Sequence, residues 1–122
     1  MYKRQLEKSY RDSNNYSLAV LIRHEGVQML FAGDAVEKRT KELLKIHWPQ
    51  QLDLYKVPYH GRGNPKTKEL FDLLQPKIAV VTSDSADEAI LEGCQQWKSE
   101  LYFTSEEDLN FISDGKSMQK HE

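Results

Sequence analysis

The chain has 122 residues, of which 39% are hydrophobic, and its 17 Lys and Arg against 19 Asp and Glu give a formal net charge of -2. This length suits one domain with one modest core, and the balanced charge argues against tight binding to nucleic acid through phosphate contacts alone. No apolar run approaches a membrane span, the charged start does not resemble a signal peptide, and Cys94 has no second cysteine to pair with, so we expect a cytoplasmic protein without membrane contact.

The first part of the chain predicts a β-hairpin followed by a helix. Residues 17–23 are rich in Leu, Val and Ile, Gly26 suits a tight turn, and residues 27–32 form the return strand. Asp34 then stands where a helix N-cap would stand, and a helical stripe of mainly apolar residues follows over 36–47.

The middle of the chain alternates strands and helices. We predict strands over 52–57 and 77–83, helices over 66–74 and 86–97, and a loop over 58–65 that holds two Gly and two Pro. The strand over 77–83 is apolar without alternation, which is typical of a sheet covered on both faces.

The chain should end in two short strands, over 100–104 and 109–113, on either side of a turn. We expect residues 1–13 and 116–122 to be flexible. The resulting order β-β-α-β-α-β-α-β-β predicts a single α/β domain, in which a mixed sheet is flanked by helices.

Asp34 and His60 each follow a predicted strand, and each has a glycine beside it. Because functional groups in α/β sheets gather at the carboxyl ends of strands, we expect the sheet to bring these two side chains to one edge. A carboxylate and an imidazole are good ligands for zinc, manganese or iron. Two plainer interpretations stay open here: Asp34 is a helix N-cap, and His60 is a loop histidine that hydrogen-bonds a carbonyl.

The remaining histidines and the cysteine are weaker candidates. His24 lies in the hairpin turn, His47 on the last turn of a helix and His121 in the tail. Cys94 shares an apolar helical stripe with Trp97, which favours a place in the core over a role as nucleophile.

Three ordered blocks carry a family resemblance: "NNYSLAVLIRHEGVQMLFAGDA", "LDLYKVPYHGRGNPKTKELFDLLQPKIAVVTS" and "LYFTSEEDLNFISDG". Together they resemble the C-terminal half of a metallo-β-lactamase-fold domain, closest to that of the ComEC-type competence proteins of DNA uptake. That group has a strand ending in Gly-Asp-Ala, a later K-V-P-H-H-G step, a Q/K-P-K-x-A-V strand and a closing T-x-x-x-G-x-I hairpin. The resemblance covers roughly 14–115.

The resemblance implies roles for individual residues. Asp34 matches the aspartate that binds or bridges the metals, and His60 matches the histidine of the late metal-binding loop. Tyr59 stands where the group often has a first histidine, Arg62 where a serine is common, and residues 14–17 match an N-N-x-S opening only loosely.

The chain also departs from the family. The first metal motif, His-x-His-x-Asp-His, is absent, and "SDSADEAI" replaces the Y-G-H-P step, so at most two protein ligands remain. Catalytic zinc normally takes three protein ligands and a water. The resemblance therefore implies half of an αββα sandwich, whose exposed apolar face should pair with a second copy of the chain or with the missing N-terminal half.

The function implied by the resemblance is part of a metal-dependent hydrolase, with a phosphodiester or nucleic-acid substrate by family analogy only. The expected metal is zinc, and manganese is the second choice. If the site is incomplete in this chain, we expect the chain alone to hold no metal and to be inactive. The alternative is a catalytically inactive binding or assembly module that keeps the scaffold. A third interpretation is an α/β domain in which Asp34 and His60 have no joint role.

Overall fold

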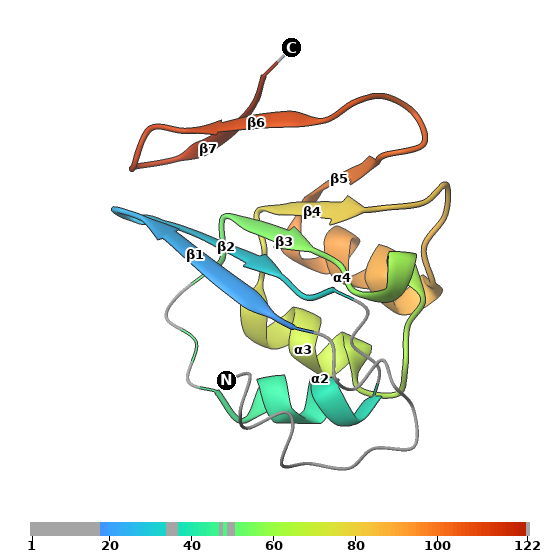
Figure 1. Ribbon diagram of the computed structural model, residues 1–122. Coiled ribbons are helices and arrows are strands. Elements are labelled where there is room, and N and C mark those ends of the chain that lie inside the picture. Colours follow the sequence, from blue (N-terminus) through green and yellow to red (C-terminus); the bar gives the residue numbers. More distant parts are fainter. Residues whose placement is uncertain (1–17, 34–36, 47, 49–50, 122) are drawn as a thin grey trace.

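The computed structural model describes residues 18–33, 37–46, 48 and 51–121. Figure 1 shows the order of the elements. They are β1 (Val20–His24), β2 (Val27–Phe31), α2 (Glu37–Leu44), β3 (Leu54–Lys56), a short 3-10 turn η2 (Tyr59–Gly61), α3 (Thr67–Leu74), β4 (Ile78–Val81), α4 (Glu88–Trp97), β5 (Glu100–Phe103), β6 (Asn110–Ser113) and β7 (Met118–His121).

The main sheet is mixed, as the sequence predicts. Its five strands lie in the order β1-β2-β3-β4-β5, with β1 antiparallel to β2 and all other neighbours parallel. The α/β class and the flanking helices are therefore confirmed. The parallel strands β2 to β5 all end at the same edge of the sheet, which sets where loop residues can meet.

The helices α2, α3 and α4 all lie on one face of the sheet (Figure 1). The main core fills the space between these helices and the sheet, because the apolar stripes of α3 and α4 face the inward side chains of the strands. Tyr55 of β3 meets Phe71 of α3 edge-on, with 6.0 Å between ring centroids. Cys94 is part of this core, and its burial raises the pKa of the thiol to about 11, so the prediction that it is a core residue is confirmed.

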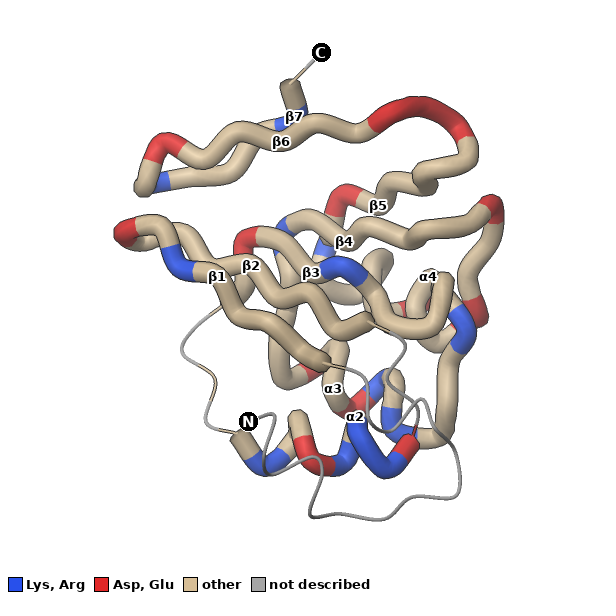
Figure 2. The backbone as a smooth tube through the Cα atoms, in the orientation of Figure 1, with Lys and Arg blue, Asp and Glu red and all other residues tan. Residues whose placement is uncertain are grey.

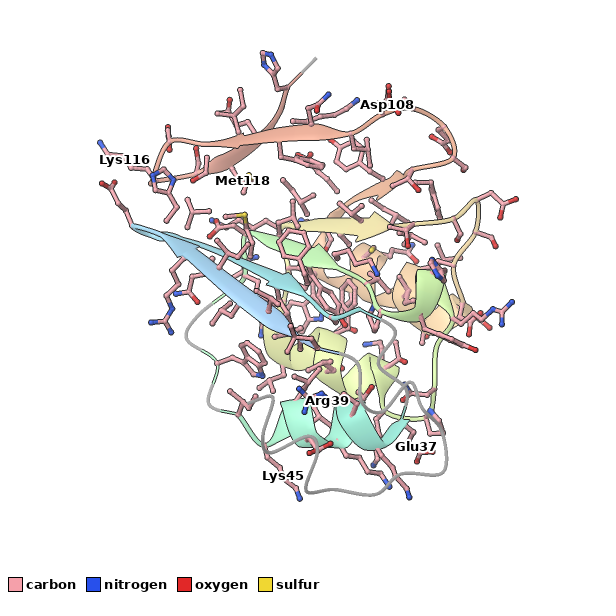
Figure 3. All side chains as sticks on the ribbon, viewed as in Figure 1. Glu37, Arg39, Lys45, Asp108, Lys116 and Met118 are labelled. Atoms are coloured by element: carbon pink, nitrogen blue, oxygen red, sulfur yellow. The ribbon has the colours of Figure 1, made fainter. Side chains whose placement is uncertain are left out.

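The opposite face of the sheet is covered in part by the hairpin of β6 and β7 (Figure 1). Side chains of the hairpin, Met118 among them, fill the space above the sheet (Figure 3). They pack on a second apolar cluster that includes Leu54, Ile78 and Val80. All four residues of β4 are buried as a result, which confirms the prediction of a strand covered on both faces.

The two strands expected over 100–104 and 109–113 are present as β5 and β6, and they belong to different sheets, because β5 pairs with β4 and β6 pairs with β7. Phe111 packs edge-on against Tyr102, with centroids 5.7 Å apart, so β6 lies over the face of β5 and not beside its edge. Met118–His121, within the tail expected to be flexible, form β7, whereas residues 1–13 lie outside the described residues.

The hairpin leaves one side of this face open. Val20 is opposite Phe31 and Ile22 is opposite Met29 in the register of β1 and β2, so these side chains project to the same face as the second cluster. Val20, Ile22 and Phe31 are 39%, 43% and 38% exposed. These three side chains form an exposed apolar strip over β1 and β2.

Candidate functional site

The ends of β2 and β3 are tied together at the carboxyl edge of the sheet. These two strands are parallel, and Gly33 and Tyr59 follow them closely. The backbone N–H of Tyr59 donates to the carbonyl of Gly33 at 2.9 Å, and Lys56 Nζ donates to the same carbonyl at 3.2 Å. The residue before Asp34 is therefore hydrogen-bonded to the residue before His60.

Asp34 itself lies outside the described residues, as do residues 14–17 and His47. Whether Asp34 caps a helix or meets His60 thus stays a prediction. Gly33, the residue directly before Asp34, is the last described residue of this segment.

The loop that carries His60 has an unusual backbone. Tyr59, His60 and Gly61 have φ angles of 53°, 53° and 86°, three left-handed residues in succession. Such a conformation costs a non-glycine residue about 1–2 kcal/mol. At Gly61 a Cβ would lie 2.8 Å from the carbonyl oxygen of Ser85, so only glycine fits. Non-glycine residues held in this region persist only where their surroundings impose it, and they cluster at functional sites.

His60 is exposed, and its ring is held by the residue that follows β4. Its Nδ1 lies 2.9 Å from Thr82 Oγ1 and 3.2 Å from the Thr82 carbonyl oxygen. The Ser83 hydroxyl donates to the carbonyl of His60 at 2.8 Å. The plainer interpretation of His60, a loop histidine bonded to a carbonyl, is therefore also present in the structure.

Residues 59–62 and 82–87 line an open hollow of about 510 Å³ at this edge. The guanidinium of Arg62 lies over the ring of Tyr59, 5.4 Å from its centroid, which limits the freedom of both side chains. Asp87 accepts a hydrogen bond from the backbone N–H of Gly63 at 2.5 Å, so this carboxylate fastens the loop to the start of α4. The hollow is polar and open to water, and it is lined by hydroxyl, imidazole and guanidinium groups together with the carboxylates of Asp84 and Asp87.

A complete metal centre is not formed by the described residues. No group of three His, Cys, Asp or Glu side chains within 18–33, 37–46, 48 and 51–121 is arranged to hold a metal ion. The imidazole of His60, exposed beside a hollow, suits a divalent metal as one ligand. A full set would need Asp34 and further ligands from outside the described part of the chain.

Sequence reasoning missed Thr82 and Ser83. The rule that singled out Asp34 and His60, a polar residue directly after a parallel strand, applies equally to the "TS" that follows β4. The predicted strand over 77–83 includes both residues, whereas β4 ends at Val81, so the sequence alone does not place these hydroxyls at a strand end.

His24 and His121 do not line this hollow. His24, expected to be a solvated turn residue, ends β1, and its Nδ1 lies 2.7 Å from Ser113 Oγ, which links the first hairpin to the last. His121 belongs to β7. Figure 2 shows Lys and Arg interspersed with Asp and Glu along α2, whereas the charged residues of the loop between β5 and β6 are all acidic.

Comparison with known proteins gives one informative similarity. No family model matches the chain. The chain is 27% identical over 70 residues, 57% of its length, to ComE operon protein 3 of Bacillus subtilis (strain 168), and the match spans only 9% of that protein. The comparison thus supports a likeness to a competence-related protein. No family model supports the assignment to the metallo-β-lactamase fold.

Within the described residues, no helix combines the length and the apolar character that crossing a bilayer requires.

Proposed function

We propose that this chain is part of a metal-dependent hydrolase of the metallo-β-lactamase superfamily, with Asp34 and His60 as metal ligands. The observation that carries the proposal is the hydrogen bond from Tyr59 to Gly33, which fastens the chain directly before Asp34 to the chain directly before His60. The left-handed backbone at the exposed His60 supports it, because non-glycine residues in this conformation cluster at functional sites.

The chemistry at this edge follows from the residues that frame it. A divalent metal, zinc in preference to manganese, would act as a Lewis acid and lower the pKa of a bound water. His60 would contribute an imidazole nitrogen and Asp34 a carboxylate to its ligand set. Arg62 places a positive charge at the rim, where an anionic substrate group such as a phosphodiester can be held.

The chain by itself holds too few ligands for catalysis. The His-x-His-x-Asp-His motif is absent from the sequence, and the relative that it matches is far longer than the matched segment. The remaining ligands would come from an N-terminal half or from a second copy of the chain. A phosphodiester or nucleic-acid substrate rests on the likeness to the competence-related relative alone.

The strip of Val20, Ile22 and Phe31 is the surface on which such a partner would pack. These three apolar side chains are between 38% and 43% exposed and adjoin the buried cluster under the hairpin. Covering them would continue that cluster over β1 and β2. Sedimentation at micromolar concentration tests this, since we expect a dimer that Ile22→Asp converts to a monomer, and a monomeric wild type would contradict it.

A binding or assembly module without catalysis is the second candidate. It rests on the sequence, which lacks the His-x-His-x-Asp-His motif. Under this alternative the strip would still be covered by a partner, but the strained loop at His60 would have no ligand to serve.

Metal content per chain separates the two. Because a second copy of the chain is expected to complete the ligand set, elemental mass spectrometry should find close to one zinc or manganese per chain in the wild type, and little in Asp34→Ala and His60→Ala. His24→Ala is the matched control, because it removes a histidine at a distant hairpin and should keep the metal. Metal retained in both site variants, or absent from the wild type, would contradict the metal-site proposal.

A further inference from the structure

We infer that Thr82 is a positioning residue for His60, which holds the imidazole with its proton on Nδ1 and its lone pair on Nε2. The purpose of this arrangement rests on the proposed function, because a metal is bound by the nitrogen that carries the lone pair. The arrangement itself is a property of the chain without metal.

The position of the proton follows from the two contacts of Nδ1. A carbonyl oxygen can only accept, so the Thr82 carbonyl at 3.2 Å attracts Nδ1 only if that nitrogen carries the hydrogen. The Thr82 hydroxyl at 2.9 Å can accept the same hydrogen. With the opposite tautomer, two lone pairs would face each other across the carbonyl contact. Both contacts together therefore favour the Nδ1–H form.

The support for Thr82 is rigid. It follows β4 directly, and β4 is buried on both faces and paired with β3 and β5. The backbone N–H of Val57 donates to the carbonyl of Val80 at 2.9 Å, so the strands stay in register up to the loop. A side chain placed by a central strand is held more closely than one on a free loop.

The next residue holds the main chain of His60 in the same way. Ser83 donates to the carbonyl of His60 at 2.8 Å and also lies 2.7 Å from the carbonyl of Ser85. Thr82 thus fixes the ring while Ser83 fixes the backbone, and the left-handed conformation at His60 is kept in place from both sides.

The test is the tautomer of His60, read from the ¹⁵N shifts of its two ring nitrogens in metal-free protein at about pH 8.5, well above the ordinary histidine pKa. We expect Nδ1 to be protonated in the wild type. Thr82→Val keeps the shape but removes the hydroxyl acceptor, so the ratio of Nδ1–H to Nε2–H should fall about fivefold, the effect of losing one hydrogen bond. Thr82→Ser should restore it.

Thr104→Val is the matched control, because it makes the same change directly after the neighbouring strand β5 and should leave the ratio unchanged. A wild-type His60 that is protonated mainly on Nε2, or a ratio unaltered in Thr82→Val, would overturn the inference. The amide spectrum of the sheet shows whether each variant is folded. If Nδ1–H is found but the protein holds no metal, the positioning role stands and the proposed function fails.

Discussion

The two ends of the parallel strands use polar residues in opposite ways. At the amino end, Asp53 is 5% exposed, and its carboxylate accepts from the backbone N–H of Gln28 at 2.9 Å and lies 3.5 Å from Lys77 Nζ. At the carboxyl end, His60 is exposed on a left-handed backbone beside an open hollow.

The comparison distinguishes a residue whose side chain stabilises the fold from a residue whose side chain is positioned by the fold. A buried carboxylate that satisfies a backbone donor joins β2 to β3, and its loss leaves that donor unpaired. An exposed imidazole on a strained backbone adds little to stability. Removing the side chain of Asp53 should therefore lower the free energy of unfolding, whereas removing the side chain of His60 should not.

The largest effect is expected at the glycine that lets the His60 loop form. A Cβ on Gly61 would lie 2.7 Å from Val81 Cγ1 at a φ of 86°, so Gly61→Ala should lower the free energy of unfolding by about 2–4 kcal/mol in urea denaturation. Gly63→Ala is the control in the same loop, because its Cβ would meet Asp87 Oδ2 at a milder 3.2 Å. Equal effects of the two changes would argue against a uniquely constrained loop.

Asp53→Ala should lower the free energy of unfolding by roughly 1–3 kcal/mol, since the buried N–H of Gln28 loses its side-chain acceptor. Asp53→Asn keeps an acceptor oxygen and loses only the ion pair to Lys77, which is 55% exposed, so it should cost less than about 1 kcal/mol. Chemical denaturation of both variants measures the difference. If both cost the same, the ion pair and not the hydrogen bond stabilises this end.

His60→Gly should leave the free energy of unfolding unchanged or raise it by up to about 1 kcal/mol, because glycine adopts positive φ without the cost that a side chain bears. His24→Gly, within β1, should instead destabilise by about 0.5–1 kcal/mol. A clear loss of stability in His60→Gly would make His60 a structural residue and remove the contrast between the two ends.

The smallest expected effect is a pH dependence of stability that arises in the β6–β7 turn. This turn contacts the first hairpin, because the backbone N–H of Gly26 donates a hydrogen bond to the carbonyl of Gly115. The backbone N–H groups of Ser117 and Lys116 hold the pKa of Asp114 below its ordinary value. Its contribution to stability is therefore present above the ordinary pKa and is lost as the pH falls through the lowered one.

Amide shifts of Lys116 and Ser117, followed from about pH 6 to about pH 2, report this titration. We expect a midpoint below the ordinary aspartate value, and no such titration in Asp114→Asn. A midpoint at or above that value would mean that the turn does not depend on the charge.

The sequence predicts the α/β class and much of the core, because apolar periodicity is a local pattern. It does not predict that β6 lies over the face of the sheet, since this depends on the packing of Phe111 on Tyr102, a tertiary contact that local sequence patterns do not specify. Nor does it reveal Thr82, whose role depends on β3 and β4 being neighbours. The place of Asp34 depends on residues outside the described part of the chain.

The most direct test of the account is a crystal of the chain grown with zinc and measured at the zinc absorption edge. The account predicts an anomalous peak at about 2.0–2.1 Å from His60 Nε2, with a carboxylate oxygen of Asp34 at a similar distance. Crystals without a peak at His60, or with peaks only at His24 and His121, would contradict the claim that the carboxyl edge of the sheet is a metal site.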